Sequence, residues 1–284
     1  MNIPDSCAKC IFDKQKAVTD DPAFLADVKD LLDHRAESDT SPIMVYKISR
    51  LYERHFGRPR SYETVKKQYN DLVLSMEDAV REKIRLSPDP LASAVAYSRM
   101  GNYIDFGAMN EVSEESFLAL LGQPGLEERD LAAYDSFLSE CGRGRSFLLL
   151  ADNCGEIVFD KILLGELHSR FPQLHFSVMV RGGEVLNDVT EEDAAYVKLE
   201  QTADIVSSGA AVAGTVYEMM TPEARRVLDS ADVVLSKGQG NYESLCFSGR
   251  HIFYSLLCKC ELFMNRFQVP KLTGVFAEMR EAEQ

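Results

Sequence analysis

Acidic and amide side chains follow short apolar runs in the second half of this 284-residue chain. Asp152 and Asn153 come directly after the run SFLLLA, and Asn187 and Asp188 come shortly after HFSVMV. Carboxylate and amide oxygens are the ligands that Mg²⁺ or Mn²⁺ prefers, and a set of two carboxylates and one amide leaves coordination positions for water and a phosphate group. These residue types predict a divalent-metal site with Asp152, Asn153 and Asp188 as ligands.

Lysine and glycine residues follow two other apolar runs and would suit the phosphate group itself. The string SKGQGNYE contains Lys237, Gly238 and Asn241, and Lys259 follows HIFYSLL. A lysine ammonium can offset phosphate charge, and glycine lets backbone N–H groups come close to an oxyanion. Together with a bound ion, these residues indicate phosphoryl-transfer chemistry.

Each of these features also has a purely structural interpretation. Asp152-Asn153 and Asn187-Asp188 both suit a turn or the N-cap of a helix. The Gly-x-Gly of SKGQGNYE is weak by itself, and neither a P-loop string nor a full G-x-G-x-x-G occurs. A phosphoaspartyl enzyme of the haloacid-dehalogenase type needs Asp-x-Asp after its first strand, where this chain has Cys154. The prediction therefore rests on the combination of motifs.

A parallel sheet would bring these residues together, because short apolar runs alternate with amphipathic segments after residue 145. Ligands of open parallel sheets bind beyond the carboxyl ends of the strands, which is where the polar residues stand. The expected strands are 146–151, 175–180, 204–208, 232–236 and 251–257, and the expected helices between them are 156–171, 190–203 and 221–230.

The first half of the chain is expected to be helical. Apolar residues recur at three- and four-residue spacing in 21–37, 41–57, 62–84 and 89–105, with Asp, Ser or Pro near the starts. We therefore expect an α/β protein with a mainly helical domain at 1–145 and an α/β metal-binding catalytic domain at 146–284. Two polar sets in the helical half need placing: Asn102 and Asp105 either cap a helix or face the cleft, and Lys66, Lys67 and Asn70 are expected on a solvated helix face.

Composition excludes several classes of function. The 31 basic and 45 acidic residues give a net charge of −14, which repels a phosphate backbone, so nucleic acid is not an expected partner. No apolar stretch approaches the roughly 20 residues that span a bilayer, and MNIPDSCAKC lacks the layout of a signal peptide. We expect no membrane partner and a cytoplasmic location.

Seven cysteines, an odd number, suggest free thiols or a metal site in a reducing compartment. Cys7-x-x-Cys10 and Cys258-x-Cys260 could supply four thiolates to zinc or form a redox pair, although Cys-x-Cys is not the usual zinc spacing. A non-enzymatic, thiol-based metal-binding protein is therefore one alternative function.

Several strings taken together resemble the damage-control phosphatases, a family first described as domain of unknown function eighty-nine. These strings are CAKC, DPLASAVAYSRMGNYIDFG, DNCGEIVFD, RGGEVLNDVT and SKGQGNYE, in the family's order over nearly the whole chain. The resemblance implies a helical N-terminal part on a Rossmann-like α/β part that carries a divalent metal and hydrolyses phosphorylated metabolites; the early Cys-x-x-Cys resembles the mark of its stand-alone microbial subgroup. By the resemblance, Asp152, Asn153 and Asp188 match the metal-ligand positions, and Lys237, Gly238, Asn241 and Glu243 match the phosphate-side motif.

We therefore expect a metal-dependent phosphomonoester hydrolase that acts on small phosphorylated metabolites, such as sugar phosphates or phosphorylated cofactor precursors, in metabolite damage control. The expected cofactor is Mg²⁺, Mn²⁺, Co²⁺ or Ni²⁺. An alternative is an S-adenosylmethionine-dependent carboxyl methyltransferase, as described for related sequences, although the glycine-rich turn typical of such enzymes is missing. Glu261 stands where the family would have a proline, which leaves the role of Lys259 and Cys260 open. The expected catalytic residues are Asp152, Asp188, Lys237 and Glu243, and the expected substrate-binding residues are Arg181, Ser208, Gly238, Asn241 and Lys259.

Overall fold

A six-stranded sheet forms the centre of the protein in this computed structural model, which describes residues 3–103 and 125–280. The strand order is β3-β2-β1-β4-β5-β6; the first five strands are parallel, and β6 is antiparallel to β5. The prediction of a mainly parallel, Rossmann-like sheet is confirmed. The strands are β1 Ser146–Leu150, β2 His175–Val180, β3 Asp204–Ser207, β4 Val233–Lys237, β5 Ile252–Leu257 and β6 Gly274–Met279.

Helices cover both faces of this sheet, which explains why its strands are apolar at nearly every position. Successive strand residues point to opposite faces, so Phe147 and Leu149 pack with one helical layer and Leu148 and Leu150 with the other. The first layer is α4 Glu63–Arg85, α5 Pro90–Met100, α7 Glu128–Arg143 and α8 Glu156–Arg170, and the second is α10 Pro222–Ser230, α11 Gly238–Leu245 and α12 Glu261–Phe267.

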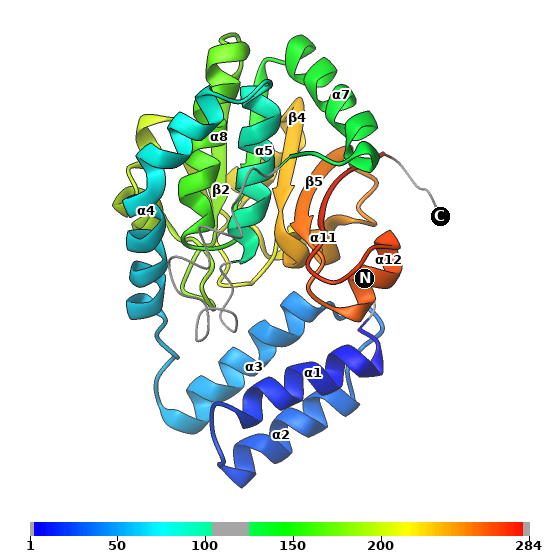
Figure 1. The fold of residues 1–284 in the computed structure, drawn as a ribbon. Coiled ribbons are helices and arrows are strands. Elements are labelled where there is room, and N and C mark those ends of the chain that lie inside the picture. Colours follow the sequence, from blue (N-terminus) through cyan, green and yellow to red (C-terminus); the bar gives the residue numbers. More distant parts are fainter. Residues whose placement is uncertain (1–2, 104–124, 281–284) are drawn as a thin grey trace.

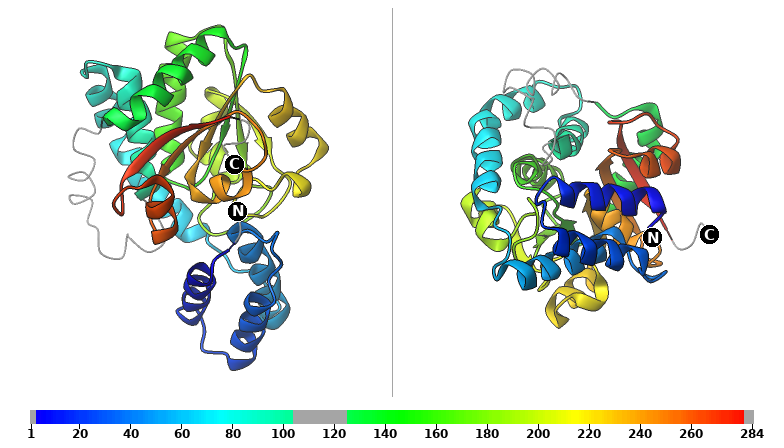
Figure 2. Two further views of the ribbon diagram at one scale, coloured as in Figure 1. Left: turned by 90° about the vertical axis from the view of Figure 1, so that its right-hand side faces the viewer. Right: turned by 90° about the horizontal axis from the view of Figure 1, so that it is seen from below.

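Three N-terminal helices form a small bundle with its own core. They are α1 Asp5–Lys16, α2 Pro22–Asp33 and α3 Ser41–Phe56, and their buried residues include Phe24, Val28, Met44 and Ile48. The Asp21 side chain caps α2 by accepting a hydrogen bond from the Phe24 N–H at 2.7 Å. The bundle lies below the sheet in Figure 1, and Figure 2 shows it as a separate lobe in the side view.

The hydrophobic core does not divide at residue 145. Residues of α4, α5 and α7 share one buried cluster with α8 and the sheet, whereas α1–α3 pack among themselves. The division by core therefore falls in the 57–62 segment that joins α3 to α4, and the predicted helical domain is split between the bundle and a layer of the α/β part. Both groups of helices show the same apolar spacing, so spacing alone does not distinguish the bundle from the layer.

Most expected elements are confirmed, with differences in the shorter ones. The helix expected at 190–203 ends early: α9 Glu191–Tyr196 is followed by Lys198 with a positive φ of 59° and the 3-10 turn η2 Leu199–Gln201. The remaining 3-10 turns are η1 Gly101–Tyr103 and η3 Tyr217–Met219. Elements α1, α7, α11, α12 and β6 were not predicted from the sequence. In the part of the chain that the structure describes, no helix has the length and apolar character to cross a membrane.

Candidate active site

The predicted metal ligands lie where the chain changes direction across the sheet. After β1 it proceeds to β2 and β3 on one side and then returns to β4 and β5 on the other, and ligands of such sheets bind at this switch point. Asp152 and Asn153 follow β1, while Gly238 follows the neighbouring β4. Figure 1 shows that the end of β4 where α11 begins points toward the α1–α3 bundle.

Backbone hydrogen bonds bring Asp188 next to the Asp152-Asn153 pair. Asn153 and Asp188 form an isolated antiparallel bridge; the Val189 N–H donates to the Asp152 carbonyl at 2.9 Å and the Cys154 N–H to the Asn187 carbonyl at 2.8 Å. The loops after β1 and β2 are therefore joined directly. All three predicted ligands are buried, with 9% or less of each residue exposed.

Arg181 holds the two ligand carboxylates from within the protein. Its Nε donates to Asp188 Oδ2 at 2.6 Å, Nη2 lies 3.5 Å from Asp152 Oδ1, and Nη1 donates to Asn241 Oδ1 at 3.0 Å. The residue is 2% exposed. Because its guanidinium nitrogens face protein acceptors, Arg181 offsets the charge of the carboxylates in this structure, in place of the substrate contact that we expected.

The Asp152 carboxylate is fixed on two sides. Its Oδ2 accepts hydrogen bonds from Asn102 Nδ2 at 2.9 Å and from Asn153 Nδ2 at 2.7 Å. Gly238 has a positive φ of 74°, and a Cβ at this position would overlap the Asp152 carboxylate. Burial raises the pKa of Asp152 to about 7, and repulsion from Asp188 and Glu156 acts in the same direction.

Glu156 completes the site, although the sequence analysis did not single it out. Its Oε2 accepts from Asn102 Nδ2 at 2.8 Å and from Asn153 Nδ2 at 3.2 Å, and its Oε1 accepts from Lys237 at 2.6 Å. The side chain is fully buried. A signal was present in the sequence: Glu156 and Asp160 are four residues apart, hence on one face of a helix whose surrounding residues are apolar.

Lys237 lies behind the predicted metal ligands, and its contacts in this structure are with protein groups, whereas we predicted contact with phosphate. Its Nζ lies 2.6 Å from Glu156 Oε1, 2.7 Å from Asp160 Oδ1 and 3.1 Å from the Ser98 carbonyl oxygen, and its side chain is fully buried. Strand periodicity explains the orientation, because Lys237 points to the same face as Leu235, which packs with α5 and α8.

The charges of this buried group depend on one another. Burial opposes the charged form of Lys237, yet Asp160 and Glu156 hold its pKa above the ordinary value. Burial likewise raises the pKa of Asp160 to about 6, although Lys237 acts to lower it. Removal of Lys237 would therefore leave two buried carboxylates without a compensating charge.

Asn241 and Ser208 stabilise loops around the site. Asn241 Nδ2 donates to the Ala151 carbonyl at 3.0 Å and the Lys237 carbonyl at 2.8 Å, so it ties the end of β1 to the end of β4. Ser208 Oγ accepts from the Gly182 N–H at 3.2 Å. Both side chains are buried. Their contacts in this structure are with protein groups, whereas we predicted contacts with substrate.

Glu243 and Lys259 have different neighbours. Burial raises the pKa of Glu243, and hydrogen bonds from Ser41 oppose this rise, so the Glu243 carboxylate faces the start of α3. That position does not support the predicted role of Glu243 in orienting a nucleophile. Lys259, by contrast, is close enough to Asp152 for its charge to lower the Asp152 pKa.

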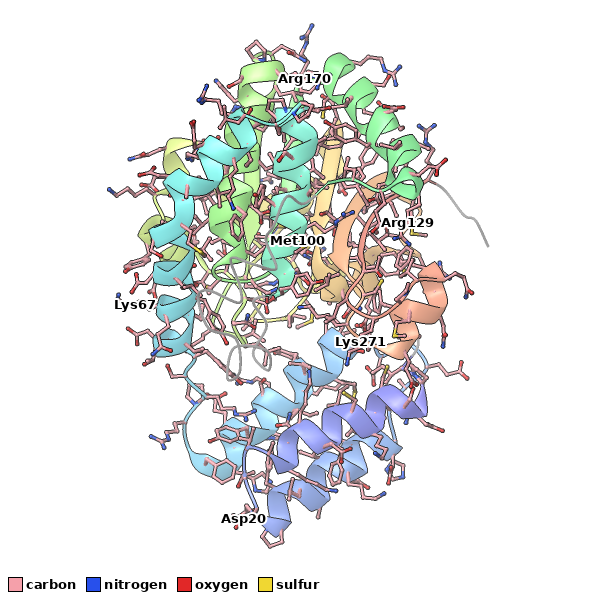
Figure 3. All side chains as sticks on the ribbon, viewed as in Figure 1. Asp20, Lys67, Met100, Arg129, Arg170 and Lys271 are labelled. Carbon is pink, nitrogen blue, oxygen red and sulfur yellow. The ribbon has the colours of Figure 1, made fainter. Side chains whose placement is uncertain are left out.

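The polar residues singled out in the helical half differ in where they lie. Asn102 faces the site, which settles the choice between capping and the cleft, while Asp105 lies outside the described residues. Asn70 is buried and its Oδ1 accepts from the Gly155 N–H at 2.6 Å; Lys66 is buried against Asp193 at 2.5 Å. Of the three residues expected on a solvated face, only Lys67 is exposed, and Figure 3 shows it on the outer side of α4.

The donor set fits a hard divalent cation. Two buried carboxylates and one amide converge. Burial and then repulsion from Asp188 and Glu156 raise the pKa of Asp152, and a bound cation would offset that repulsion. Asn102 Oδ1 is a buried acceptor with no hydrogen-bond partner among the described residues, so the site also has an oxygen available for water or a ligand.

The cysteines show no metal-binding arrangement in the described part of the chain. Over residues 3–103 and 125–280, no group of three or more His, Cys, Asp or Glu side chains is arranged to hold a metal ion. All seven cysteines are free thiols. Burial and the nearby Cys260 raise the pKa of Cys7 to about 11, so the start of α1 lies near the start of α12.

Sequence comparison relates the chain to known proteins. Residues 4–273 match the family model described as the damage-control phosphatase ARMT1-like domain. The chain is 31% identical over 276 residues to a protein of Archaeoglobus fulgidus named damage-control phosphatase, covering 92% of this chain and 93% of that protein. A damage-control phosphatase of Pyrococcus horikoshii is 27% identical over 77% of this chain and 74% of its own.

The fold has also been seen in a solved structure. The crystal structure of a DUF89 family protein from Pyrococcus horikoshii superposes with a TM-score of 0.80 at 23% identity, covering 99% of this chain and 100% of that chain. At this identity the match concerns the fold, and it extends over both the α1–α3 bundle and the sheet.

Proposed function

The chain belongs to the damage-control phosphatase family with the ARMT1-like domain, and from this membership we propose that it is a metal-dependent phosphomonoester hydrolase acting on small phosphorylated metabolites. The observation that carries the proposal is the convergence of Asp152, Asn153 and Asp188 at the switch point of the sheet. Sugar phosphates and phosphorylated cofactor precursors are the proposed substrates.

The three residues would hold Mg²⁺, Mn²⁺, Co²⁺ or Ni²⁺ through oxygen atoms. When bound, such an ion supplies positive charge to the phosphoryl group and lowers the pKa of coordinated water. The chain itself orients the ligands: Arg181 holds Asp188 and Asp152, while Asn102 holds Asp152. Asp188 is the proposed group for orienting the attacking water, because Glu243 faces α3.

Lys259 and the start of α11 are the proposed phosphate-binding groups. Lys237 is fully buried against Glu156 and Asp160, whereas Lys259 is partly exposed and its charge acts on Asp152. The first amides of α11 begin at Gly238, beside the Asp152 carboxylate. A lysine and backbone N–H groups at a helix start together suit a phosphate anion.

The cysteines also bear on the cellular location and on the two alternative functions. Seven free thiols support a reducing compartment, and we place the enzyme in the cytoplasm. We favour no methyltransferase or thiol-based metal carrier, because the relatives are named phosphatases and the cysteines do not form a metal-binding cluster among the described residues.

The proposal is tested by measuring phosphate release from a panel of sugar phosphates and phosphorylated cofactor precursors. Activity should require added divalent metal and disappear with a chelator, and Asp188→Asn should abolish it because the ion loses a charged ligand. Glu37→Gln, an exposed acidic residue in the bundle, serves as the matched control. Undiminished turnover in chelator, with metal content verified as negligible, would reject the metal-dependent mechanism.

A further inference from the structure

Three buried residues outside the metal-ligand set, Lys237, Glu156 and Asn102, are linked by hydrogen bonds to one another and to the ligands. Lys237 contacts Glu156, and Glu156 contacts both Asn102 and Asn153. We infer that Glu156 is a positioning residue, which sets the amide of Asn153 so that its oxygen, and not its nitrogen, is presented to the ion. This inference rests on the proposed metal site and goes beyond it by giving a role to residues outside the ligand set.

The amide orientation follows from hydrogen-bond chemistry. An ionised carboxylate can only accept hydrogen bonds, so the side-chain group that faces it must be a donor. Asn153 Nδ2 lies 2.7 Å from Asp152 Oδ2 and 3.2 Å from Glu156 Oε2. Two acceptors therefore hold the NH₂ group on one side, which leaves the Asn153 oxygen on the other side of the planar amide, where it can ligate.

Asn102 applies the same constraint from the helical half of the chain. Its Nδ2 donates to Asp152 Oδ2 at 2.9 Å and to Glu156 Oε2 at 2.8 Å, so it bridges the carboxylates that also hold Asn153. Figure 3 labels Met100, which ends α5 just before Asn102, near the middle of the molecule. Gly101 allows this approach, because a Cβ there would lie 2.9 Å from the Glu156 Cα and 2.8 Å from Phe159 Cδ2.

Lys237 fixes Glu156 in this position. Its Nζ contacts Glu156 Oε1 at 2.6 Å, which leaves the other oxygen, Oε2, for the two asparagines. Asp160 shares the same ammonium at 2.7 Å and itself accepts from Ser98 Oγ at 2.6 Å. All of these side chains are buried, so few other arrangements satisfy them. Lys237 therefore acts on the ligands through Glu156.

The substitution Glu156→Gln tests this role directly. The amide that it introduces would keep an oxygen for Lys237 but turn an NH₂ group toward the NH₂ groups of Asn102 and Asn153, so that donors would face donors. Asn153 would rotate and present nitrogen to the ion. Mn²⁺ affinity, measured by calorimetry with Mn²⁺ alone, should fall roughly 10- to 100-fold, the range for loss of an outer-shell partner.

Asn153→Asp supplies the decisive comparison, because a carboxylate presents oxygen on either side and needs no orientation. In the Asn153→Asp background, Glu156→Gln should leave Mn²⁺ affinity unchanged or raise it, since it also removes repulsion between two carboxylates. The control is Lys161→Met. Lys161 is in α8, as Glu156 is, and the substitution removes its ion pair with Glu77 of α4 at 2.8 Å without changing a residue of the site.

The outcomes separate this inference from the proposed function. The positioning role is supported if Glu156→Gln lowers Mn²⁺ affinity in the wild-type background but not in the Asn153→Asp background. An equal loss in both backgrounds, or a loss no larger than that of Lys161→Met, overturns it while the metal site stands. A wild-type protein that binds no Mn²⁺ would overturn the metal site and the positioning role together.

Discussion

Two lysines in this chain show how burial decides the role of a residue type. Lys237 and Lys259 both follow apolar strands, and both were expected to contact phosphate. Lys237 is fully buried between Glu156 and Asp160, and its charge serves to compensate carboxylates. Lys259 is partly exposed and acts on Asp152. Sequence position alone cannot separate them, because both strand tips lie at the same edge of the sheet.

Lys259→Ala should lower kcat/KM on the order of 10²-fold, the typical cost of one lost oxyanion contact, while Mn²⁺ affinity is retained. An ammonium offsets phosphate charge but cannot ligate a cation. Steady-state kinetics and calorimetry measure the two effects separately, with the exposed Lys67→Ala as control. Full activity of Lys259→Ala on every metal-dependent substrate would remove Lys259 from the phosphate site.

Gly238→Ala should abolish activity and Mn²⁺ binding, because the new Cβ would overlap the Asp152 carboxylate. The matched control is Gly57→Ala: Gly57 has a similar positive φ of 70°, against 74° at Gly238, and no atom within 4 Å of the added Cβ. Both variants carry backbone strain of ~1–3 kcal/mol, visible in thermal unfolding. An active Gly238→Ala enzyme would show that Asp152 can move without loss of the ion.

The strands and helices of the α/β part could be predicted well, and the reason is physical. Alternating apolar runs and amphipathic segments specify β1, β2, β3, β4 and β5 and the helices that connect the first four of them, although not α11. The switch-point rule places Asp152 and Asp188 at one edge. What could not be predicted is which side chains turn inward. Glu156 and Lys237 form their contact across two elements, and only tertiary packing determines that partner.

The entry to β1 depends on one exposed carboxylate. Asp232 Oδ2 accepts from the Arg145 N–H at 2.8 Å and the Ser146 N–H at 3.0 Å. These two backbone hydrogen bonds lower the pKa of Asp232 below its ordinary value. A carboxylate with a lowered pKa contributes stability that is present above its unfolded pKa of about 3.9 and is lost as the pH falls through its folded pKa.

Asp232→Asn should therefore lower the free energy of unfolding by ~1 kcal/mol at pH 7, a value discounted for solvent exposure. The difference from wild type should shrink when the pH is taken below about 3.9, the unfolded pKa, because wild-type Asp232 is then increasingly protonated. Urea denaturation at both pH values measures this, with Glu37→Gln as an exposed control. A difference in unfolding free energy that stays constant or grows in acid would contradict the role of Asp232 in holding the start of β1.

At the scale of the whole molecule, the α1–α3 bundle is a second unit attached to the strand tips. Glu184, in the loop after β2, accepts hydrogen bonds from the Tyr62 N–H and from Ser61 Oγ. Pro42, at the start of α3, lies against Gly214 and Gly240. The segment after α3 therefore contacts the loop that carries Asp188, and the start of α3 contacts the loop after β3 and α11. The side view in Figure 2 shows the bundle beneath the rest of the molecule.

Glu184→Ala should speed amide hydrogen exchange in residues 61–63 while β1 keeps its protection, because the loop loses an anchor of about 1 kcal/mol. Glu184→Gln retains an acceptor and should show a smaller effect. Exchange followed by mass spectrometry resolves both segments. Unchanged exchange at 61–63 in Glu184→Ala would mean that other contacts hold the bundle in place.

The most direct test of the central claim is the position of the ion itself. A crystal of the wild-type protein grown with Mn²⁺ gives an anomalous signal that locates the metal independently of any assay. We predict one ion within ~2.0–2.6 Å of oxygen atoms from Asp152, Asn153 and Asp188, the range for hard-cation ligands. An ion bound elsewhere, for example at the thiols of Cys7 and Cys260, with none at the tips of β1 and β2, would contradict the account.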